Sequence, residues 1–161
     1  MSRLTLFAVV LLAACVGKTS HMPQGNYRPN GGQVYSSAVF DSSRLPGRWQ
    51  QVAGFGPASC KPGAVDIKTQ GKTAYRLCLS GREVKGAGQI RAVGPGRLAI
   101  AGQEWWVLWA DGDYRTMVIG HPSGAFGFVL NRGGKISADR MTAAREILEW
   151  NGYDLTQFQT F

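Results

Sequence analysis

The chain has 161 residues, enough for one domain with a substantial core, and 44% of them are hydrophobic. Its 22 glycines favour many tight turns over long helices, so a mostly β fold is expected. The net charge of +8 is scattered along the chain rather than gathered in a basic tract. This argues against a nucleic-acid-binding protein and favours an anionic membrane surface or lipid headgroup as the electrostatic partner.

The first residues follow the pattern of an export signal. Arg3 precedes a nine-residue run from Leu4 to Leu12 that is apolar except for Thr5, and this run is far shorter than the roughly 20 residues needed to span a bilayer. We therefore expect residues 1–14 to be a cleaved signal peptide.

A cysteine follows this run directly. Leu12-Ala13-Ala14-Cys15 resembles the bacterial lipobox, which implies acylation of Cys15 and a lipid anchor in the membrane. The alternative is an ordinary signal cut after Ala14. Val16 stands where an inner-membrane retention signal would have Asp, so the resemblance implies the outer membrane, with its periplasmic face as the location.

The next stretch, residues 15–38, is rich in Gly, Pro, Asn, Gln and Ser and has few apolar residues. Such a composition is typical of a flexible tether between an anchor and a folded domain. His21 lies in it and is expected to be a solvated side chain rather than a metal ligand.

From residue 39 onward, short apolar runs alternate with turn residues. The turns include Ser80-Gly81, Ala101-Gly102 and Asp111-Gly112, all suited to tight hairpins. We expect strands over residues 48–55, 64–68, 73–79, 84–93 and 97–101, and three more between 105 and 132. Eight antiparallel strands joined in chain order can close into an up-and-down barrel, which leaves an interior for one small ligand.

Alternation along the strands predicts which side chains face inward. Trp49, Gln51, Ala53 and Phe55 share one face of the first strand. Trp105 shares a face with Trp109, opposite Trp106. Phe126, Phe128 and Leu130 share the face of Arg132.

One helix is expected at about residues 137–151, beginning at Ser137 or Asp139 and ending at Asn151-Gly152. Met141, Ala144, Ile147 and Leu148 lie on one of its faces, so the helix can pack on the outside of the barrel. A short strand-like tail, Tyr153 to Phe158, follows.

Three blocks in this order resemble the lipocalin family, and specifically the bacterial outer-membrane lipocalins. They are Gly47-x-Trp49, Asp113-Tyr114-Arg115 and Leu130-Asn131-Arg132, followed by the helix and a Gly-Tyr-Asp-Leu tail. The resemblance implies that Gly47, Trp49, Asp113, Tyr114 and Arg132 are structural residues. It also implies that Arg132 packs across Trp49 at one end of the barrel, where a guanidinium gains cation–π attraction from an indole.

The two other cysteines are expected to pair in an exported protein. If Gln70-Gly71 is a two-residue turn, Cys78 lies near the loop that carries Cys60, and a disulfide would stabilise the fold by roughly 3 kcal/mol. The alternative is two free buried thiols.

The candidate ligand-binding residues are the polar and aromatic side chains predicted to face inward: Gln51, Phe55, Trp105, Phe126 and Phe128. Ordinary core packing is the alternative for the two phenylalanines. His121 has no Cys, His or Glu at ligand spacing, and the chain contains no catalytic or metal motif, so we expect neither a cofactor nor a metal.

The sequence therefore predicts a membrane-anchored carrier, not an enzyme, for a small hydrophobic ligand such as a fatty acid or lysophospholipid in the bacterial envelope. The main alternative is an inhibitor or scaffold lipoprotein that acts through its loops around a filled interior. A third is an isomerase or cyclase, which would need a buried polar residue with a shifted pKa.

Overall fold

A computed structural model describes residues 21, 22 and 24–161. The predicted signal peptide and Cys15 lie outside these residues. The strands are β1 (Gly47–Phe55), β2 (Ala64–Ile67), β3 (Lys72–Leu79), β4 (Arg82–Gln89), β5 (Arg91–Gly94), β6 (Arg97–Ile100), β7 (Gln103–Ala110), β8 (Thr116–Gly120), β9 (Gly127–Asn131) and β10 (Phe158–Thr160). They are joined by helix α1 (Ala138–Trp150) and the short 3-10 helices η1 (Ser42–Arg44) and η2 (Leu155–Gln157).

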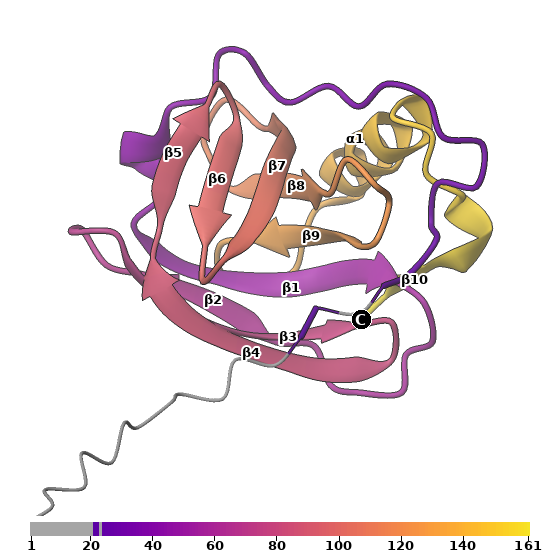
Figure 1. Ribbon diagram of the computed structural model, residues 1–161, viewed down its shortest axis with the longest axis horizontal. Helices are drawn as coiled ribbons and strands as arrows, with labels where there is room; N and C mark the ends of the chain where they lie inside the picture. Colours follow the sequence, from indigo (N-terminus) through magenta and orange to yellow (C-terminus); the bar gives the residue numbers. More distant parts are fainter. Residues whose placement is uncertain (1–20, 23) are drawn as a thin grey trace, which may run out of the picture.

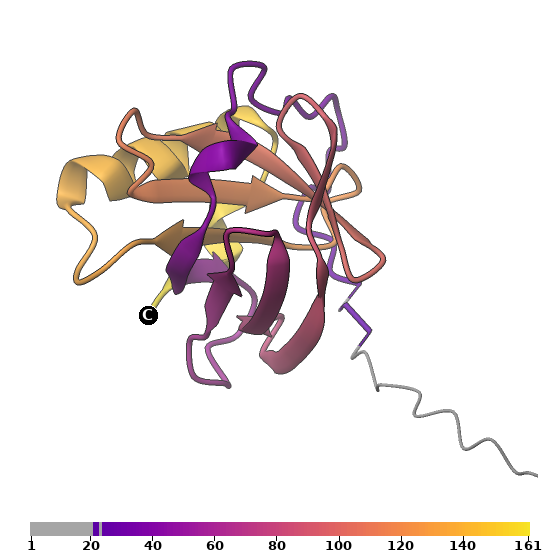
Figure 2. The same ribbon diagram turned by 90° about the vertical axis from the view of Figure 1, so that its left-hand side faces the viewer.

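All ten strands form one curled antiparallel sheet, with α1 packed on its outer side (Figures 1 and 2). Nine follow the order β4-β3-β2-β1-β9-β8-β7-β6-β5, and β10 pairs with β1. The two ends of this path, β4 and β5, are consecutive in the chain and separated by Ile90, which bends the backbone from β3 toward β6. Counted together, they are the single strand predicted for residues 84–93. The predicted all-β barrel with an outer C-terminal helix is confirmed.

The sheet separates two apolar clusters. The inner cluster contains the large side chains of the barrel interior, including Trp49, Trp105 and Phe128. The outer cluster lies between the sheet and α1 and includes the fully buried Ala144 and Leu148 of the predicted helix face. No helix among the described residues is long and apolar enough to cross a membrane.

The chain after α1 differs in part from the predicted tail. Residues Leu155–Gln157 form η2 rather than a strand, because Asp154 caps them by accepting a hydrogen bond from the Thr156 amide at 3.0 Å. Extended structure is limited to β10, which pairs Phe158 with Phe55 of β1.

The predicted disulfide is confirmed. Cys60 and Cys78 are bonded, with their Cα atoms 5.6 Å apart and a sequence separation of 18. The bond ties the β1–β2 loop to β3.

The flexible tether predicted for residues 15–38 is wrong for the part that the structure describes. Residues 24–40, which we call the strap, run across the barrel from the β8–β9 turn past α1 to η1 (Figure 1). The amides of Gly25 and Tyr27 donate to Ala125 and Gly124, each at 3.0 Å, and Tyr27 and Val34 are buried in the outer cluster. The strap is ordered by these contacts despite its polar composition.

Arg28 is the centre of the strap's attachment. Its side chain is only 5% exposed, and its guanidinium donates to the carbonyls of Asn151 (2.6 Å), Pro122 (2.7 Å), Gly31 (3.0 Å) and Gly32 (2.9 Å). One side chain thus joins the strap to the end of α1 and to the β8–β9 turn.

We predict that Arg28→Ala lowers the free energy of unfolding by about 2–4 kcal/mol, because hydrogen bonds from a charged donor are lost and carbonyls are left buried. Urea unfolding followed by tryptophan fluorescence measures the change. Arg48→Ala is the control: its ion pair with Asp66 is exposed, so about 0–1 kcal/mol should be lost. Equal losses in the two variants would contradict the role assigned to Arg28.

Candidate functional site

The barrel interior is lined by a connected set of aromatic rings. The centroid of Trp105 lies 5.1 Å from Phe128 and 5.1 Å from Tyr75, and Phe126 lies 6.0 Å from Phe128. Three of the five predicted ligand-binding residues, Trp105, Phe126 and Phe128, are therefore together inside the barrel. All three are at most 2% exposed, so the interior is closely packed.

One polar group in this interior is left over. The indole Nε1–H of Trp105 is buried and has no hydrogen-bond partner among the described residues. A buried donor without a partner costs about 1–3 kcal/mol, so this N–H is an available contact for an acceptor. Burial also raises the pKa of the neighbouring Tyr75, so its phenol stays protonated at neutral pH.

Gln51 faces the interior as predicted, but its amide is already used. Its Oε1 accepts from the backbone amides of Cys78 (2.8 Å) and Gly63 (3.2 Å), and its Nε2 donates to the Cys78 carbonyl at 2.7 Å. Gln51 therefore braces β3 and the β1–β2 loop beside the disulfide.

The prediction that Phe55 shares the inner face with Trp49 is wrong. Opposite β9, Gln51 pairs with Leu130 and Ala53 pairs with Val129, so Val52 is an extra residue that forms a β-bulge. The bulge reverses the alternation, and Phe55 packs outside against Tyr27 (5.3 Å) and Tyr153 (5.1 Å).

The same effect separates Trp109 from Trp105. In β7, Val107 pairs with Ile119 and Trp109 with Val118, which leaves Leu108 as the extra residue. Trp105 stays in the inner cluster, whereas Trp109 joins Trp106 against the outer cluster. Phe126, Phe128 and Leu130 do share the inner face, because β9 pairs with β8 without interruption.

Trp49 and Arg132 lie together at one end of the barrel. The Arg132 guanidinium carbon is 4.0 Å from the centroid of the Trp49 ring, and its Nη1 donates to the Pro46 carbonyl at 2.9 Å. Gly47 makes this approach possible, since its φ is +129° and a Cβ there would lie 2.8 Å from Arg132 Nη1. Burial lowers the pKa of Arg132 from its ordinary value of 12.5.

The Asp113-Tyr114 block lies in the turn between β7 and β8. The Tyr114 hydroxyl accepts from the Asp41 amide at 2.6 Å, and its ring lies under the Arg44 guanidinium at 4.0 Å. Tyr114 thus holds η1 and the end of the strap, whereas Asp113 is exposed.

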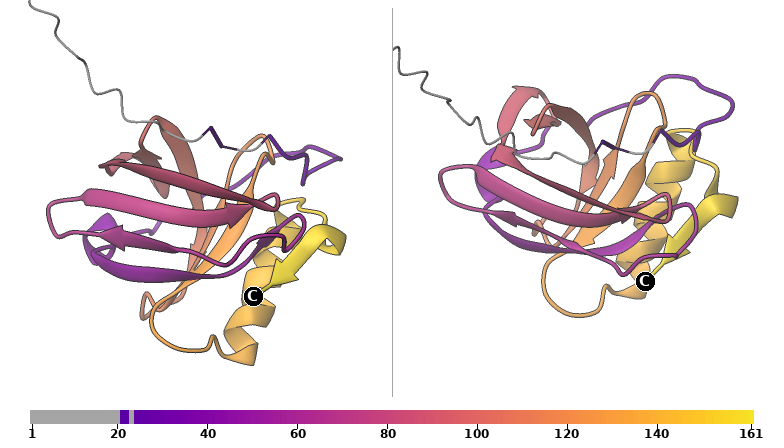
Figure 3. Two further views of the ribbon diagram at one scale, coloured as in Figure 1. Left: turned by 90° about the horizontal axis from the view of Figure 1, so that it is seen from below. Right: turned by 60° about the horizontal axis from the view of Figure 1, so that its bottom comes forward.

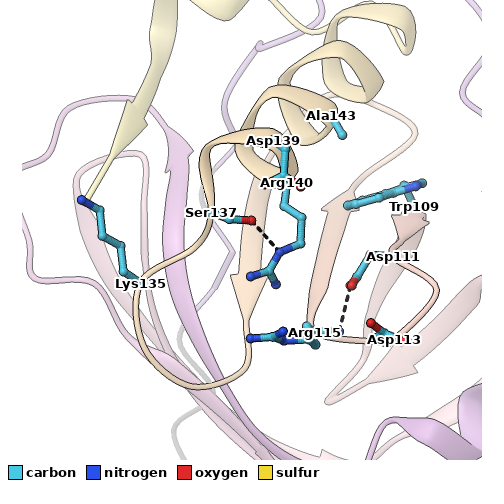
Figure 4. A pocket seen from close by; sticks show the side chains of 9 residues that line it. All are labelled: Trp109, Asp111, Asp113, Arg115, Lys135, Ser137, Asp139, Arg140 and Ala143. Carbon is cyan, nitrogen blue, oxygen red and sulfur yellow. Dashed lines mark hydrogen bonds between the residues drawn. The ribbon is translucent and has the colours of Figure 1, made fainter.

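A polar groove of about 750 Å³ lies between this turn and the start of α1 (Figure 4). Three carboxylates and three cations line it, and several bond within it or to its walls: Asp111 accepts from the Arg115 amide at 2.8 Å, and Arg140 donates to Ser137 at 2.9 Å. Arg140 also reaches the buried Thr116 of β8 at 2.8 Å. These bonds fix the helix to the turn.

The opposite end of the barrel, which we call the mouth, is formed by the β1–β2 loop, the β3–β4 turn and the β8–β9 turn. Met22 is 6% exposed and packs on the inner cluster there, and Tyr27 bonds to Ser80 through their hydroxyls. The residues before β1 therefore cover the mouth. Their apolar residues follow neither a strand nor a helix period, so these contacts were not predictable from the sequence.

His121 lies at the mouth, in the β8–β9 turn. It is half-buried, its ring is 5.1 Å from Phe126, and its Nδ1 bonds to the Ser123 hydroxyl at 2.7 Å. Burial lowers its pKa, so the ring is neutral at pH 7. No group of three or more potential metal ligands occurs in the described part of the chain.

The chain was compared with protein-family models, curated sequences and solved structures. Residues 93–161 match the family model of the lipocalin-like domain. A major allergen from cockroaches, Per a 4, is 10% identical, with a TM-score of 0.58 over 81% of this chain and 93% of the allergen. The siderocalin Ex-FABP, described as acting through dual ligand specificities, is 15% identical, with a TM-score of 0.56 over 72% of this chain and 92% of its own. Curated protein sequences give no match.

Tyr153 yields a prediction about pH. Its hydroxyl donates to the Phe126 carbonyl at 2.9 Å and accepts from the His121 amide at 2.8 Å, so it supports the mouth. Burial raises its pKa from 10.0 to about 12. The stability gained from this shift is complete below pH 10 and is lost as the pH rises through about 12.

Between pH 9 and 12, the wild type should therefore lose about 2 kcal/mol more unfolding free energy than Tyr153→Phe. Urea unfolding at each pH tests this, with Tyr35→Phe, an exposed tyrosine, expected to follow the wild type. Identical pH profiles for the wild type and Tyr153→Phe would disprove it.

Proposed function

We propose that the chain is a lipocalin that binds and carries a small hydrophobic ligand inside its barrel, a proposal supported by the match of residues 93–161 to the lipocalin-like family model. The observation that carries the proposal is the interior itself, an apolar aromatic cluster in which the Trp105 N–H lacks a partner. A ligand with an apolar body and one hydrogen-bond acceptor matches both properties. Fatty acids and lysophospholipids are ligands of this kind.

A carrier needs an entrance through which its ligand reaches the interior. The mouth is the end of the barrel at which the interior is covered by residues outside the strands. A groove of about 570 Å³ lies there between Met22, Tyr27 and the β3–β4 turn. Displacing Met22 from the inner cluster would admit a chain-like ligand next to Phe126 without breaking any strand pairing.

We further propose that Cys15 is acylated and holds the protein on the bilayer, with residues 1–14 removed as a signal peptide. The proposed location is the cell envelope, on the periplasmic face of the outer membrane. Two or three acyl chains are enough for firm anchoring, because each buried CH₂ contributes about 0.8 kcal/mol.

A second candidate function has an observation in its favour. The interior side chains are packed against one another, and this favours a scaffold or inhibitor that uses the barrel as a rigid frame for its loops. The two candidates differ in one measurable property, namely whether the purified protein takes up an apolar ligand.

Ligand uptake is measured by titrating the protein with a fluorescent fatty acid and displacing it with lysophosphatidylcholine. If Trp105 Nε1 donates to the ligand, Trp105→Phe should weaken binding about 3- to 10-fold, which corresponds to one hydrogen bond. Trp150→Phe, at a position that is 67% exposed, is the matched control and should bind as the wild type does. Absence of binding in the wild type would favour the scaffold.

Acylation is tested separately by growing cells with labelled palmitate. Label should enter the protein, and Cys15→Ala should abolish it. A variant lacking both Cys60 and Cys78 should still be labelled, since these cysteines form the disulfide. Persistent label in Cys15→Ala would disprove the anchor.

A further inference from the structure

The charge of the protein is unevenly distributed. Residues 61–97 contain eight of the 18 Lys and Arg residues but two of the ten Asp and Glu residues, a net charge of +6. Residues 98–161 contain five cations and seven anions, a net charge of −2. The eight cations of the first segment are all exposed: Lys61, Lys68, Lys72, Arg76, Arg82, Lys85, Arg91 and Arg97.

Half of these cations lie on the outer side of β3 and β4 or directly after β2. Along β3, exposed Lys72 and Arg76 alternate with buried Thr73 and Tyr75, so both cations point outward. The register pairs Arg76 with Lys85 of the neighbouring strand. We call the outer surface that carries Lys68, Lys72, Arg76 and Lys85 the basic face; Arg82 pairs with the inner-cluster residue Leu79 and lies at the mouth instead.

Small side chains form the floor between the cations. Ala74 pairs with Ala87 in register, between the Lys72 row and the Arg76–Lys85 row. A groove of about 590 Å³ crosses this floor, with Lys68 and Lys72 at its rim. The arrangement gives an anionic headgroup access to several cations at once.

The anions of the region leave part of this charge unpaired. Asp66 pairs with Arg48 at 2.8 Å, and Glu83 contacts Lys85 (2.7 Å) and Arg76 (3.2 Å). Within the described residues, Lys68, Lys72 and Arg82 form no ion pair. Neither α1 nor the strap covers this side of the sheet, as the view from below shows (Figure 3).

The N-terminal chain lies at the tip of the β3–β4 hairpin that carries part of this surface. His21 and Met22 line the groove at the mouth together with Arg82 and Glu83 of β4. Cys15 is six residues before His21, a reach of at most about 20 Å when extended. An anchor at Cys15 would therefore hold the β3–β4 hairpin close to the bilayer.

We propose that the basic face docks on the anionic phospholipid headgroups of the membrane. Phosphate groups meet the unpaired Lys68 and Lys72, and each cation near an anionic surface strengthens binding about fivefold. The orientation rests on the proposed anchor at Cys15, whereas the attraction of the basic face does not. The acidic half of the protein, with α1, faces away from the bilayer.

Lysine footprinting of the mature full chain tests this orientation. The protein is mixed with vesicles of phosphatidylcholine alone or with 30% phosphatidylglycerol, briefly acetylated, and analysed by mass spectrometry. On anionic vesicles, acetylation of Lys68, Lys72 and Lys85 should slow about fivefold or more, and 1 M salt should reverse this. Lys135, beside the start of α1, is the internal control and should react at the same rate on both vesicles.

Charge reversal gives a second readout. A Lys72→Glu and Lys85→Glu double variant should lose the protection of Lys68, whereas Lys135→Glu should keep it; these positions are exposed, so folding is preserved. Unchanged rates at all three basic-face lysines, or equal protection of Lys135, would overturn the proposal. Protection by duplex DNA but not by vesicles would also overturn it and would identify a nucleic-acid surface.

The anchor and the basic face fail in different ways. Sedimentation with phosphatidylcholine vesicles reports the acyl anchor alone, because these vesicles carry no net charge. Loss of sedimentation there, with lysine protection retained on anionic vesicles, removes the anchor and leaves the basic face. Sedimentation with phosphatidylcholine vesicles but no lysine protection on anionic vesicles removes the basic face and leaves the anchor.

Discussion

The structure depends on a sheet whose two faces are both buried over much of its area, so some strands must supply apolar side chains to both. In a regular strand, successive side chains alternate between the two faces of the sheet. In β1 and β7, a bulge exchanges the inward and outward positions partway along the strand. The extra residues Val52 and Leu108 reverse the alternation, which sends Phe55 and Trp109 outward to the layer under α1 and the strap. A bulge also bends its strand and increases its twist, as closure of a curled sheet requires.

Local signals in the sequence explain why the strand boundaries could be predicted to within a few residues. Ser80-Gly81 and Ala101-Gly102 have φ values of 52°, 72°, 50° and 77°, and two successive positive φ values define the tight turns that fit a twisted hairpin. The helix was equally well marked, by an apolar face and by the Asn151-Gly152 stop. Each of these features is specified by residues that are neighbours in the chain.

The bulges and the strap were not predictable in this way. Val52 lies in the run Gln51-Val-Ala-Gly-Phe55, where most residues suit either face, so alternation alone cannot reveal an insertion. In the strap, a few apolar side chains are spaced without period, and Arg28 finds its carbonyl partners 94 and 123 residues away. The candidate site followed the same division: the aromatic residues of the regular β9 were placed correctly, whereas Phe55, beyond a bulge, was not.

The buried, unpartnered N–H of Trp105 gives a closely packed interior a means of selecting its ligand. Its unpartnered N–H costs about 1–3 kcal/mol, and a ligand acceptor would recover that amount whereas a pure hydrocarbon would not. Selection would therefore favour lipids with a polar group over plain alkanes. Met22 covers the mouth seven residues after Cys15, so under the proposed anchor the entrance lies on the membrane side of the barrel, beside the basic face. A lipid leaving the bilayer would then meet the headgroup-binding cations first and the apolar interior second.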